Sequence, residues 1–243
     1  MAPQKFFLYL LSMLFSTEIG AVELPQPFTT TLYGRQYLVA TVETVFDLVR
    51  TGDYFKYTMR TKGRVLLVED ELYDCSVMAI RDGQIYAVEH KHTSKRNPDR
   101  DAFTRFDWSA GTAEVAIGNG RQARVTGLVW PTWDPISLKF KVMTDLLNGG
   151  LDEKQVYRLL EYGQLSEWPL RPEGEDRVNT RFGEIPTVKI ARSDGKSYKL
   201  WFSPGHRFIP VKIQFSHLTA ELITNPAEAH KRTLAESAEA PRC

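Results

Sequence analysis

One cysteine and two histidines are the residues of this sequence whose types and spacing could hold a metal ion. The sequence RDGQ at 81–84 predicts a two-residue hairpin loop, which sets the residues that face one another across the two strands. Cys75 then faces His90, and Tyr73 faces His92. Zinc and copper prefer such ligands, but their sites normally show three or four of them. We therefore interpret Cys75 as a half-buried thiol with two histidines at its rim, and keep a metal site at Cys75, His90 and His92 as the alternative.

Four aromatic residues could line an apolar binding site: Trp130, Trp133, Trp201 and Phe208. The segment 198–215 predicts two strands around a four-residue turn, with Trp201 opposite Phe208 on the face away from the main apolar stripe. Trp133 directly precedes a predicted helix. Small-molecule sites are usually apolar clefts, and they often lie at the mouths of barrels. We therefore predict these four side chains as ligand-binding residues, with burial in the core as the alternative.

Two aspartates stand beside tryptophans, Asp107 before Trp108 and Asp134 after Trp133, which suggests a glycosidase. Glycoside hydrolysis needs two carboxyl groups at a fixed separation, which a sequence does not establish, and Asp134 is already explained as a helix cap. The chain has no nucleophile-elbow, Walker or dinucleotide-binding glycine pattern. The sequence therefore predicts no catalytic residue and no cofactor, and it does not favour an enzyme.

The elements that must position these residues are mostly short strands. β-Branched and aromatic runs alternate with glycine-containing turns, which is typical of an antiparallel sheet, a sandwich or a barrel. One segment differs, because Asp134 suits an N-cap, Pro135 suits the first turn of a helix, and Gly149-Gly150 would end it. A second short helix is predicted from Asp152. The prediction is an α+β fold with one or two helices on a meandering antiparallel sheet.

The first 21 residues predict a signal peptide. Lys5 precedes an apolar run from Phe6 to Phe15, which is short for a membrane-spanning helix, and small residues follow. We predict cleavage near Ala21, export to the periplasm of a Gram-negative bacterium as a soluble protein, and no transmembrane segment after cleavage.

The remaining chain predicts one domain and a tail. The full sequence has a net charge of +1 and a hydrophobic content of 42%, which are ordinary for a globular protein and do not suggest nucleic acid binding. Residues 22–224 are predicted as a single β-rich domain, and residues 225–243 as a flexible tail that is poor in bulky apolar residues. Two cysteines, Cys75 and Cys243, fit an exported protein that does not depend on a disulfide framework.

Four stretches in this order resemble an exported bacterial family of uncharacterised function, domain of unknown function 3108 (DUF3108). The stretches are FDW at 106–108, WDPISL at 133–138, VNTRFGEIPTVKIAR at 178–192 and LWFSPGHRFIPVKIQF at 200–215. The resemblance spans Tyr33 to Leu222. It implies a fold related to the lipoprotein carriers LolA and LolB, which is a curved antiparallel half-barrel closed by helices around an apolar cavity. It supplies no catalytic residues.

These observations lead to one functional hypothesis and two alternatives. The first is a periplasmic carrier or chaperone that binds an acyl chain, a lipid or a lipoprotein. The second is an envelope assembly module that pairs with a protein partner through an exposed edge strand near Pro210, where the missing N–H suits an edge or a bulge. The third is the metal-binding protein.

Overall fold

The computed structural model describes residues 22–36, 40–66, 68–215, 218–230 and 241–243. The predicted signal peptide, residues 1–21, lies outside the described residues. The first strands are β1 (Phe28–Gln36), β2 (Ala40–Thr51), β3 (Tyr54–Val65), β4 (Val68–Arg81), β5 (Gln84–Ser94), β6 (Ala102–Asp107), β7 (Thr112–Ile117), β8 (Arg121–Thr126) and β9 (Thr132–Trp133). They are followed by the helix α1 (Ser137–Leu147), then β10 (Val156–Glu161), β11 (Gln164–Thr180), β12 (Gly183–Arg192), β13 (Tyr198–Ser203), β14 (Ile209–Phe215) and β15 (Leu218–Leu222).

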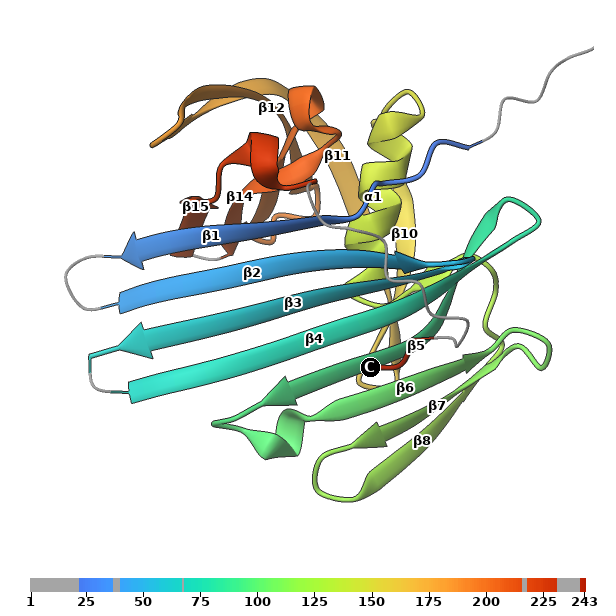
Figure 1. Cartoon of the computed structure of the whole chain (residues 1–243). Helices are drawn as coiled ribbons and strands as arrows, with labels where there is room; N and C mark the ends of the chain where they lie inside the picture. The colour runs from blue at the N-terminus through green and yellow to red at the C-terminus, as the bar shows by residue number, and fades with distance from the viewer. Residues whose placement is uncertain (1–21, 37–39, 67, 216–217, 231–240) are drawn as a thin grey trace, which may run out of the picture.

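All the described strands form one curved sheet, in the order β8-β7-β6-β5-β4-β3-β2-β1-β15-β14-β13-β12-β11-β10-β9. Neighbouring strands are antiparallel except β9 and β10, which are parallel. The sheet does not close on itself, and α1 lies inside its curve (Figure 1). The predicted α+β half-barrel with a meandering antiparallel sheet is therefore confirmed.

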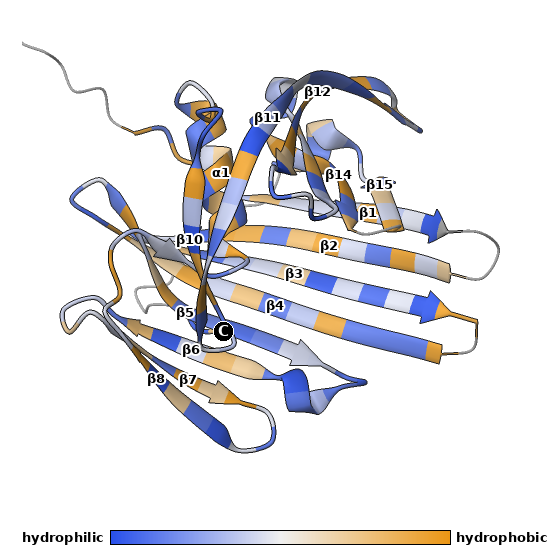
Figure 2. Cartoon of the chain, turned by 180° about the vertical axis from the view of Figure 1, so that it is seen from behind, coloured by the Kyte–Doolittle hydropathy of each residue, from blue (hydrophilic) through white to orange (hydrophobic). Residues whose placement is uncertain are grey.

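The main core fills the space between the curved sheet and α1. Hydrophobic and hydrophilic residues alternate along the long strands (Figure 2), so that one face of each strand points inward. Phe46 and Leu48 of β2 and Phe55 of β3 are buried there, and the rings of Phe55 and Phe140 lie 4.9 Å apart between centroids. Met143 of α1 belongs to the same buried cluster. The helix therefore lies on the inner face of the sheet.

The predicted second helix from Asp152 is wrong. Residues 153–154 form a turn, and Val156–Glu161 is the strand β10. This strand pairs antiparallel with the first part of β11 and buries Tyr157, Leu159 and Leu160. The capping-box pattern was a local signal only, and pairing with β11 outweighs it because a short isolated helix is marginal.

No helix among the described residues is long and apolar enough to cross a membrane.

The hairpin at 198–215 has a different register from the predicted one. Trp201 faces Lys212 instead of Phe208, and the loop runs over five residues, 204–208. The loop is longer than predicted because Phe208 also leaves the strand conformation, with φ at 58°. A bulge between Trp201 and Phe202, opposite Pro210, confirms the predicted irregularity.

The edge strand predicted near Pro210 is wrong, because β14 is paired on both sides, with β13 and β15. Pro210 instead lies at the bulge in the β13–β14 ladder, where a missing N–H is tolerated. In the described part of the chain, the outermost strands of the sheet are β8 and β9.

The described parts of the predicted tail are held against the domain. Residues 226–228 form a 3₁₀ turn capped by the Asn225 side chain, and the N–H of Thr29 donates to the carbonyl of Ala229. The His230 ring lies 3.0 Å from the carbonyl oxygen of Pro27. At the far end, Cys243 is bonded to Cys75. The prediction of a flexible tail therefore does not hold for residues 225–230 and 243.

Candidate functional site

A cavity of about 710 Å³ opens inside the curve of the sheet. One wall comes from strands near the middle of the sheet order and is mainly apolar, with Thr44 and Thr61 as its polar members. Its residues include Val42, Met59, Leu72, Ile213, Phe215 and Leu218. Trp168 of β11 and Tyr198 of β13 extend this wall, with their rings edge to face at 5.5 Å. A volume in this range suits a small molecule with a substantial apolar part.

The opposite wall of the cavity is polar. It is built by the ends of β4, β5 and β10, by the loop that follows β5, and by α1. Its residues include His92, Arg96, Arg100, Lys139, Glu161 and Tyr162. The cavity is therefore amphipathic, and a ligand that fills it needs both an apolar and a polar part.

A buried carboxylate in the polar wall, Asp74, contacts two histidines. Asp74 Oδ1 lies 2.7 Å from His92 Nδ1 and 3.6 Å from His90 Nε2. Burial by itself raises the pKa of Asp74, but the contacts with His90 and His92 outweigh it and hold this pKa well below its usual range. Burial likewise lowers the pKa of His90, but Asp134 and Asp74 raise it more, so the net shift is upward. These opposite shifts favour a negative Asp74 beside a positive His90.

Asp134 joins this polar layer to the start of α1. Its Oδ1 accepts hydrogen bonds from the N–H groups of Ile136 (2.8 Å) and Ser137 (2.9 Å). Its Oδ2 accepts from the hydroxyls of Ser76 and Ser137, both at 2.7 Å. The predicted capping role of Asp134 is confirmed by these contacts, although the regular helix begins three residues later. Asp107, by contrast, accepts from Ser109 and Ala110 in an exposed turn.

The metal site predicted as an alternative at Cys75, His90 and His92 is wrong. The Asp82-Gly83 turn forms as predicted, but a bulge between Val77 and Met78 shifts the register beyond it. His90 therefore faces Ser76, and His92 faces Asp74. Cys75 projects from the other face of β4, because successive residues of a strand alternate. The thiol and the imidazoles lie on opposite sides of the sheet.

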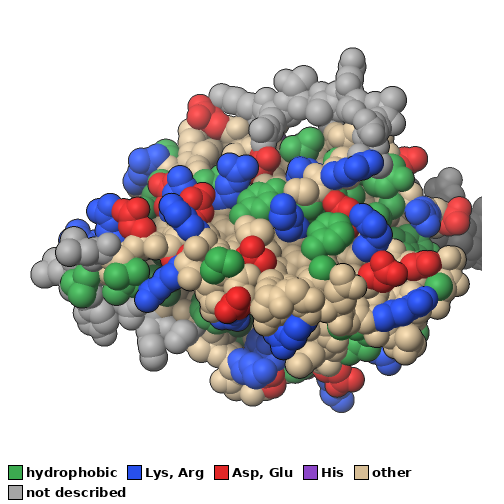
Figure 3. All heavy atoms as spheres, turned by 90° about the horizontal axis from the view of Figure 1, so that it is seen from below, with side chains coloured by type: hydrophobic (Ala, Val, Ile, Leu, Met, Phe, Trp, Pro, Cys, Tyr) green, Lys and Arg blue, Asp and Glu red, His purple; other side chains and the backbone are tan. Residues whose placement is uncertain are grey.

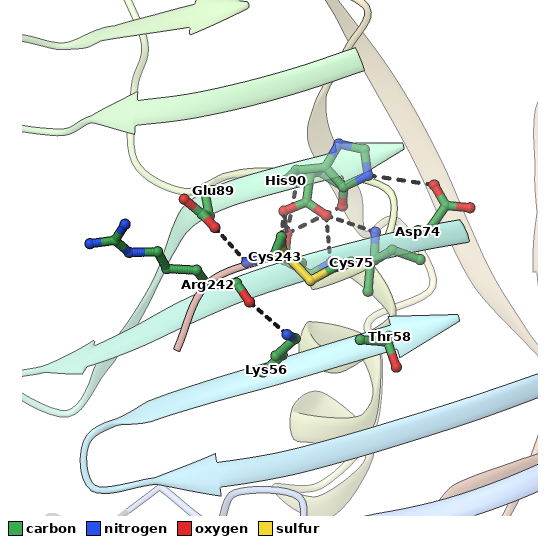
Figure 4. The surroundings of a disulfide bond; sticks show 12 residues. Lys56, Thr58, Asp74, Cys75, Glu89, His90, Arg242 and Cys243 are labelled. Atoms are coloured by element: carbon green, nitrogen blue, oxygen red, sulfur yellow. Dashed lines mark hydrogen bonds and ion pairs between the residues drawn. A yellow bond between two sulfur atoms is a disulfide. The ribbon is translucent and has the colours of Figure 1, made fainter. Parts of the chain in front are cut away.

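Cys75 is instead bonded to Cys243, with their Cα atoms 5.7 Å apart. Figure 4 shows Cys243 lying over β4, with Lys56 and Glu89 on either side. Lys56 Nζ donates to the carbonyl of Arg242, and the N–H of Cys243 donates to Glu89 Oε1, both at 2.6 Å. The end of the chain is thus fixed to the outer face of the sheet.

None of the four predicted ligand-binding aromatic residues lines the amphipathic cavity. Trp133 is buried in the main core, and Phe208 packs against the same core. Trp130 lies beside Tyr86, with ring centroids 5.8 Å apart. Trp201 lies on the outer face between the amino groups of Lys189 and Lys212 and donates its Nε1–H to Asp176. Trp201 is nevertheless only 4% exposed and belongs to the main buried cluster. Core packing therefore accounts for Trp133, Trp201 and Phe208, and a surface contact accounts for Trp130.

The sequence contained two signals for the residues that do line the cavity. Tyr198, Ile213 and Phe215 all belong to the predicted apolar stripe of the 198–215 hairpin. Lys139 lies three residues after Ile136 and four before Met143, which are both buried, so it shares the apolar side of the helix, where a lysine is unusual. Arg96 and Arg100 belong to a basic stretch, residues 89–105, which its composition predicts as a solvated loop. Their position at the cavity depends on how the chain folds after β5.

Charges on the outer surface of β5 to β8 alternate in sign. Glu89, Arg105, Glu114 and Arg124 face one another in register across the four strands. On the face seen in Figure 3, basic and acidic side chains are likewise interspersed with hydrophobic ones. Such alternation favours the folded sheet through cross-strand pairs and gives this face no extended patch of one sign.

The fold and the amphipathic cavity define a half-barrel protein with an internal cavity. The chain belongs to the family described as protein of unknown function (DUF3108), whose model matches residues 28–222. A solved structure with a similar fold is the β-barrel-like protein of domain of unknown function DUF1849 from Brucella abortus. It is 11% identical, the match covers 82% of this chain and 96% of that one, and the TM-score is 0.53. No curated protein matches the sequence.

Proposed function

We propose that this protein is a carrier or chaperone for an amphiphile with an acyl chain, such as a lipid or a lipoprotein. The observation that carries this proposal is the cavity of about 710 Å³ with apolar residues such as Val42, Ile213 and Leu218 along one wall. Burial of each methylene contributes about 0.8 kcal/mol, so a dozen of them contribute about 10 kcal/mol, which exceeds the lower values of the association cost of about 4–15 kcal/mol.

The proposed location is the periplasm. The N-terminal apolar run and the disulfide between Cys75 and Cys243 both support it, since disulfides persist in oxidising compartments and are rare in the cytosol. N-terminal sequencing of the exported protein tests this proposal. A start near Ala21 is expected, and an intact Met1 in the cell envelope fraction would contradict cleavage.

The binding proposal is tested by titrating the purified protein with a fluorescent fatty-acyl probe. We expect saturable binding, weakened at least about tenfold by Ile213→Glu, which places a charge on the apolar wall. The matched control is Leu165→Glu, because Leu165 is 48% exposed on β11 and does not line the cavity. A folded wild-type protein that takes up no probe would rule out the carrier.

The alternative function is an envelope interaction module. It is supported by the outermost position of β8, which pairs with β7 and has a free second edge among the described strands. A partner strand could add to this edge through main-chain hydrogen bonds. This function becomes the leading one if the cavity binds no amphiphile.

A further inference from the structure

Lys139 is a basic side chain enclosed in the polar wall of the cavity. Only 9% of the residue is exposed, and its Nζ donates one hydrogen bond, to the carbonyl oxygen of Pro135 at 2.8 Å. Among the described residues, no carboxylate oxygen lies within 4.0 Å of this nitrogen. A lysine is seldom buried without an anionic partner, because the loss of hydration is costly. Its nitrogen therefore has donor capacity for an anion in the cavity.

Arg100 and His92 belong to the same wall and contact the same tyrosine. The Arg100 guanidinium lies 5.7 Å from the centroid of the Tyr162 ring, and the His92 ring lies edge-on to it at 5.7 Å. Within the described chain, Arg100 makes no ion pair with a carboxylate. His92 is held by Asp74 through Nδ1, which leaves its other ring nitrogen for a different contact.

The acidic groups of this wall are largely engaged with other partners. Asp74 contacts both histidines. Asp70 Oδ1 accepts from the N–H groups of Glu71 and Arg96. Glu161 is one of the charges that raise the pKa of His90. Asp74 and Asp70 thus face imidazole or backbone donors. Among the described residues, Lys139 and Arg100 form no ion pair with a carboxylate.

We propose that Lys139 and Arg100 bind the anionic head group, a carboxylate or a phosphate, of an amphiphile whose chain lies on the apolar wall. This inference rests on the proposed function, because it assumes that the cavity holds an acyl chain. Guanidinium and ammonium groups form strong charge-assisted hydrogen bonds with such anions. The head group is then fixed at the polar wall near Tyr162, and the chain extends toward Ile213 and Leu218.

Isothermal titration with four ligands that share one chain tests this site: dodecanoate, dodecyl phosphate, dodecanol and dodecylammonium. We expect one or both anions to bind wild-type protein about tenfold more tightly than dodecanol. Lys139→Met and Arg100→Gln should each remove most of this preference and leave dodecanol binding unchanged. The anion that binds more tightly identifies the head group.

The matched control is Lys141→Met, since Lys141 lies on the same helix but pairs with Asp145 and does not line the cavity. It should keep the preference for the anions. Arg100→Gln, in an exposed loop, keeps the test valid if Lys139→Met does not fold. Equal affinity for dodecanol and both anions, or tightest binding of dodecylammonium, would overturn the head-group site and retain the carrier. If none of the four binds, the proposed carrier function itself fails.

Discussion

The two faces of the β4–β5 hairpin differ in what they bury. On the inner face, Asp74 and Ser76 meet His90, His92 and the start of α1 in a hydrogen-bonded polar layer. On the outer face, Cys75 forms a disulfide bond with Cys243. Both faces are buried, although strands of an antiparallel sheet often leave one face to water. The hairpin thus links the cavity on one side with the chain terminus on the other.

The difference teaches how stability is distributed across the sheet. The disulfide on the outer face lowers the conformational entropy of the unfolded chain, because it closes a loop over a sequence separation of 168 residues. The inner contacts act in the folded state, where buried polar groups depend on their partners. Changes to the two faces should therefore differ in size and in their dependence on reductant and pH.

The largest effect is expected on the outer face. Cys243→Ser should lower the free energy of unfolding by about 4–5 kcal/mol, because the long loop regains its entropy in the unfolded state. Urea unfolding with and without dithiothreitol measures this loss, and reduced wild-type protein should behave like the variant. Identical midpoints for oxidised and reduced wild-type protein would contradict the assigned role of the disulfide.

A smaller effect is expected where the inner face meets α1. Asp134→Ala removes an acceptor that serves Ser76, Ile136 and Ser137, and should cost about 3 kcal/mol because buried donors lose their partner. Asp107→Ala is the control. It removes a similar set of contacts from an exposed turn and should cost about 1 kcal/mol or less. Equal losses in thermal unfolding would argue against the importance of burial.

The pH dependence of stability should report the inner face. The raised pKa of His90 means that its contribution is fully present below about pH 6.5, the ordinary histidine value, and is lost as pH rises through its folded-state pKa. The lowered pKa of Asp74 means that its contribution is present above about pH 4 and is lost as pH falls.

Unfolding midpoints should be measured from pH 3 to 9. The contributions of His90 and Asp74 to stability should both be present, and their sum highest, between about pH 4 and 6.5. His90→Gln should flatten the decline on the alkaline side, and the loss in wild-type protein should be about 1.4 kcal/mol for each unit by which the pKa is raised. An unchanged alkaline decline in this variant would assign it to other groups.

The smallest effect is expected at Trp201, on the outer face of another part of the sheet. Trp201→Phe removes the hydrogen bond to Asp176 and weakens the contacts with Lys189 and Lys212, which should cost about 1 kcal/mol. Binding of the fluorescent acyl probe should stay within about twofold. A large loss of probe binding in a folded Trp201→Phe variant would indicate that Trp201 is a ligand-binding residue, as the sequence predicted.

Local patterns in the sequence predicted much of the fold. The Asp82-Gly83 turn, the capping of α1 by Asp134 and the irregularity at Pro210 follow from turn and capping chemistry within a few residues. The family and the half-barrel were also predicted correctly. The second helix was not, because its local signal competes with a pairing that only β11 supplies.

The register of the β4–β5 pairing determines which side chains lie together around Asp74. The turn sequence alone did not predict this register. One bulge in the β4–β5 ladder separates Cys75 from His90 and His92 and brings these histidines to Asp74. A shift of one residue moves every later side chain to the other face of the sheet. Both histidines therefore face other residues than predicted: His90 faces Ser76, and His92 faces Asp74.

The sequence by itself determined the alternation of strands and turns, the position of the helix and the apolar stripe of the 198–215 hairpin, because these depend on neighbouring residues. Only the tertiary structure decided that Lys139 and Arg100 share a cavity with that stripe, and that Cys243 lies over Cys75. These contacts join residues far apart in the chain. They follow from the curvature of the whole sheet and from one bulge, which no short stretch of sequence specifies.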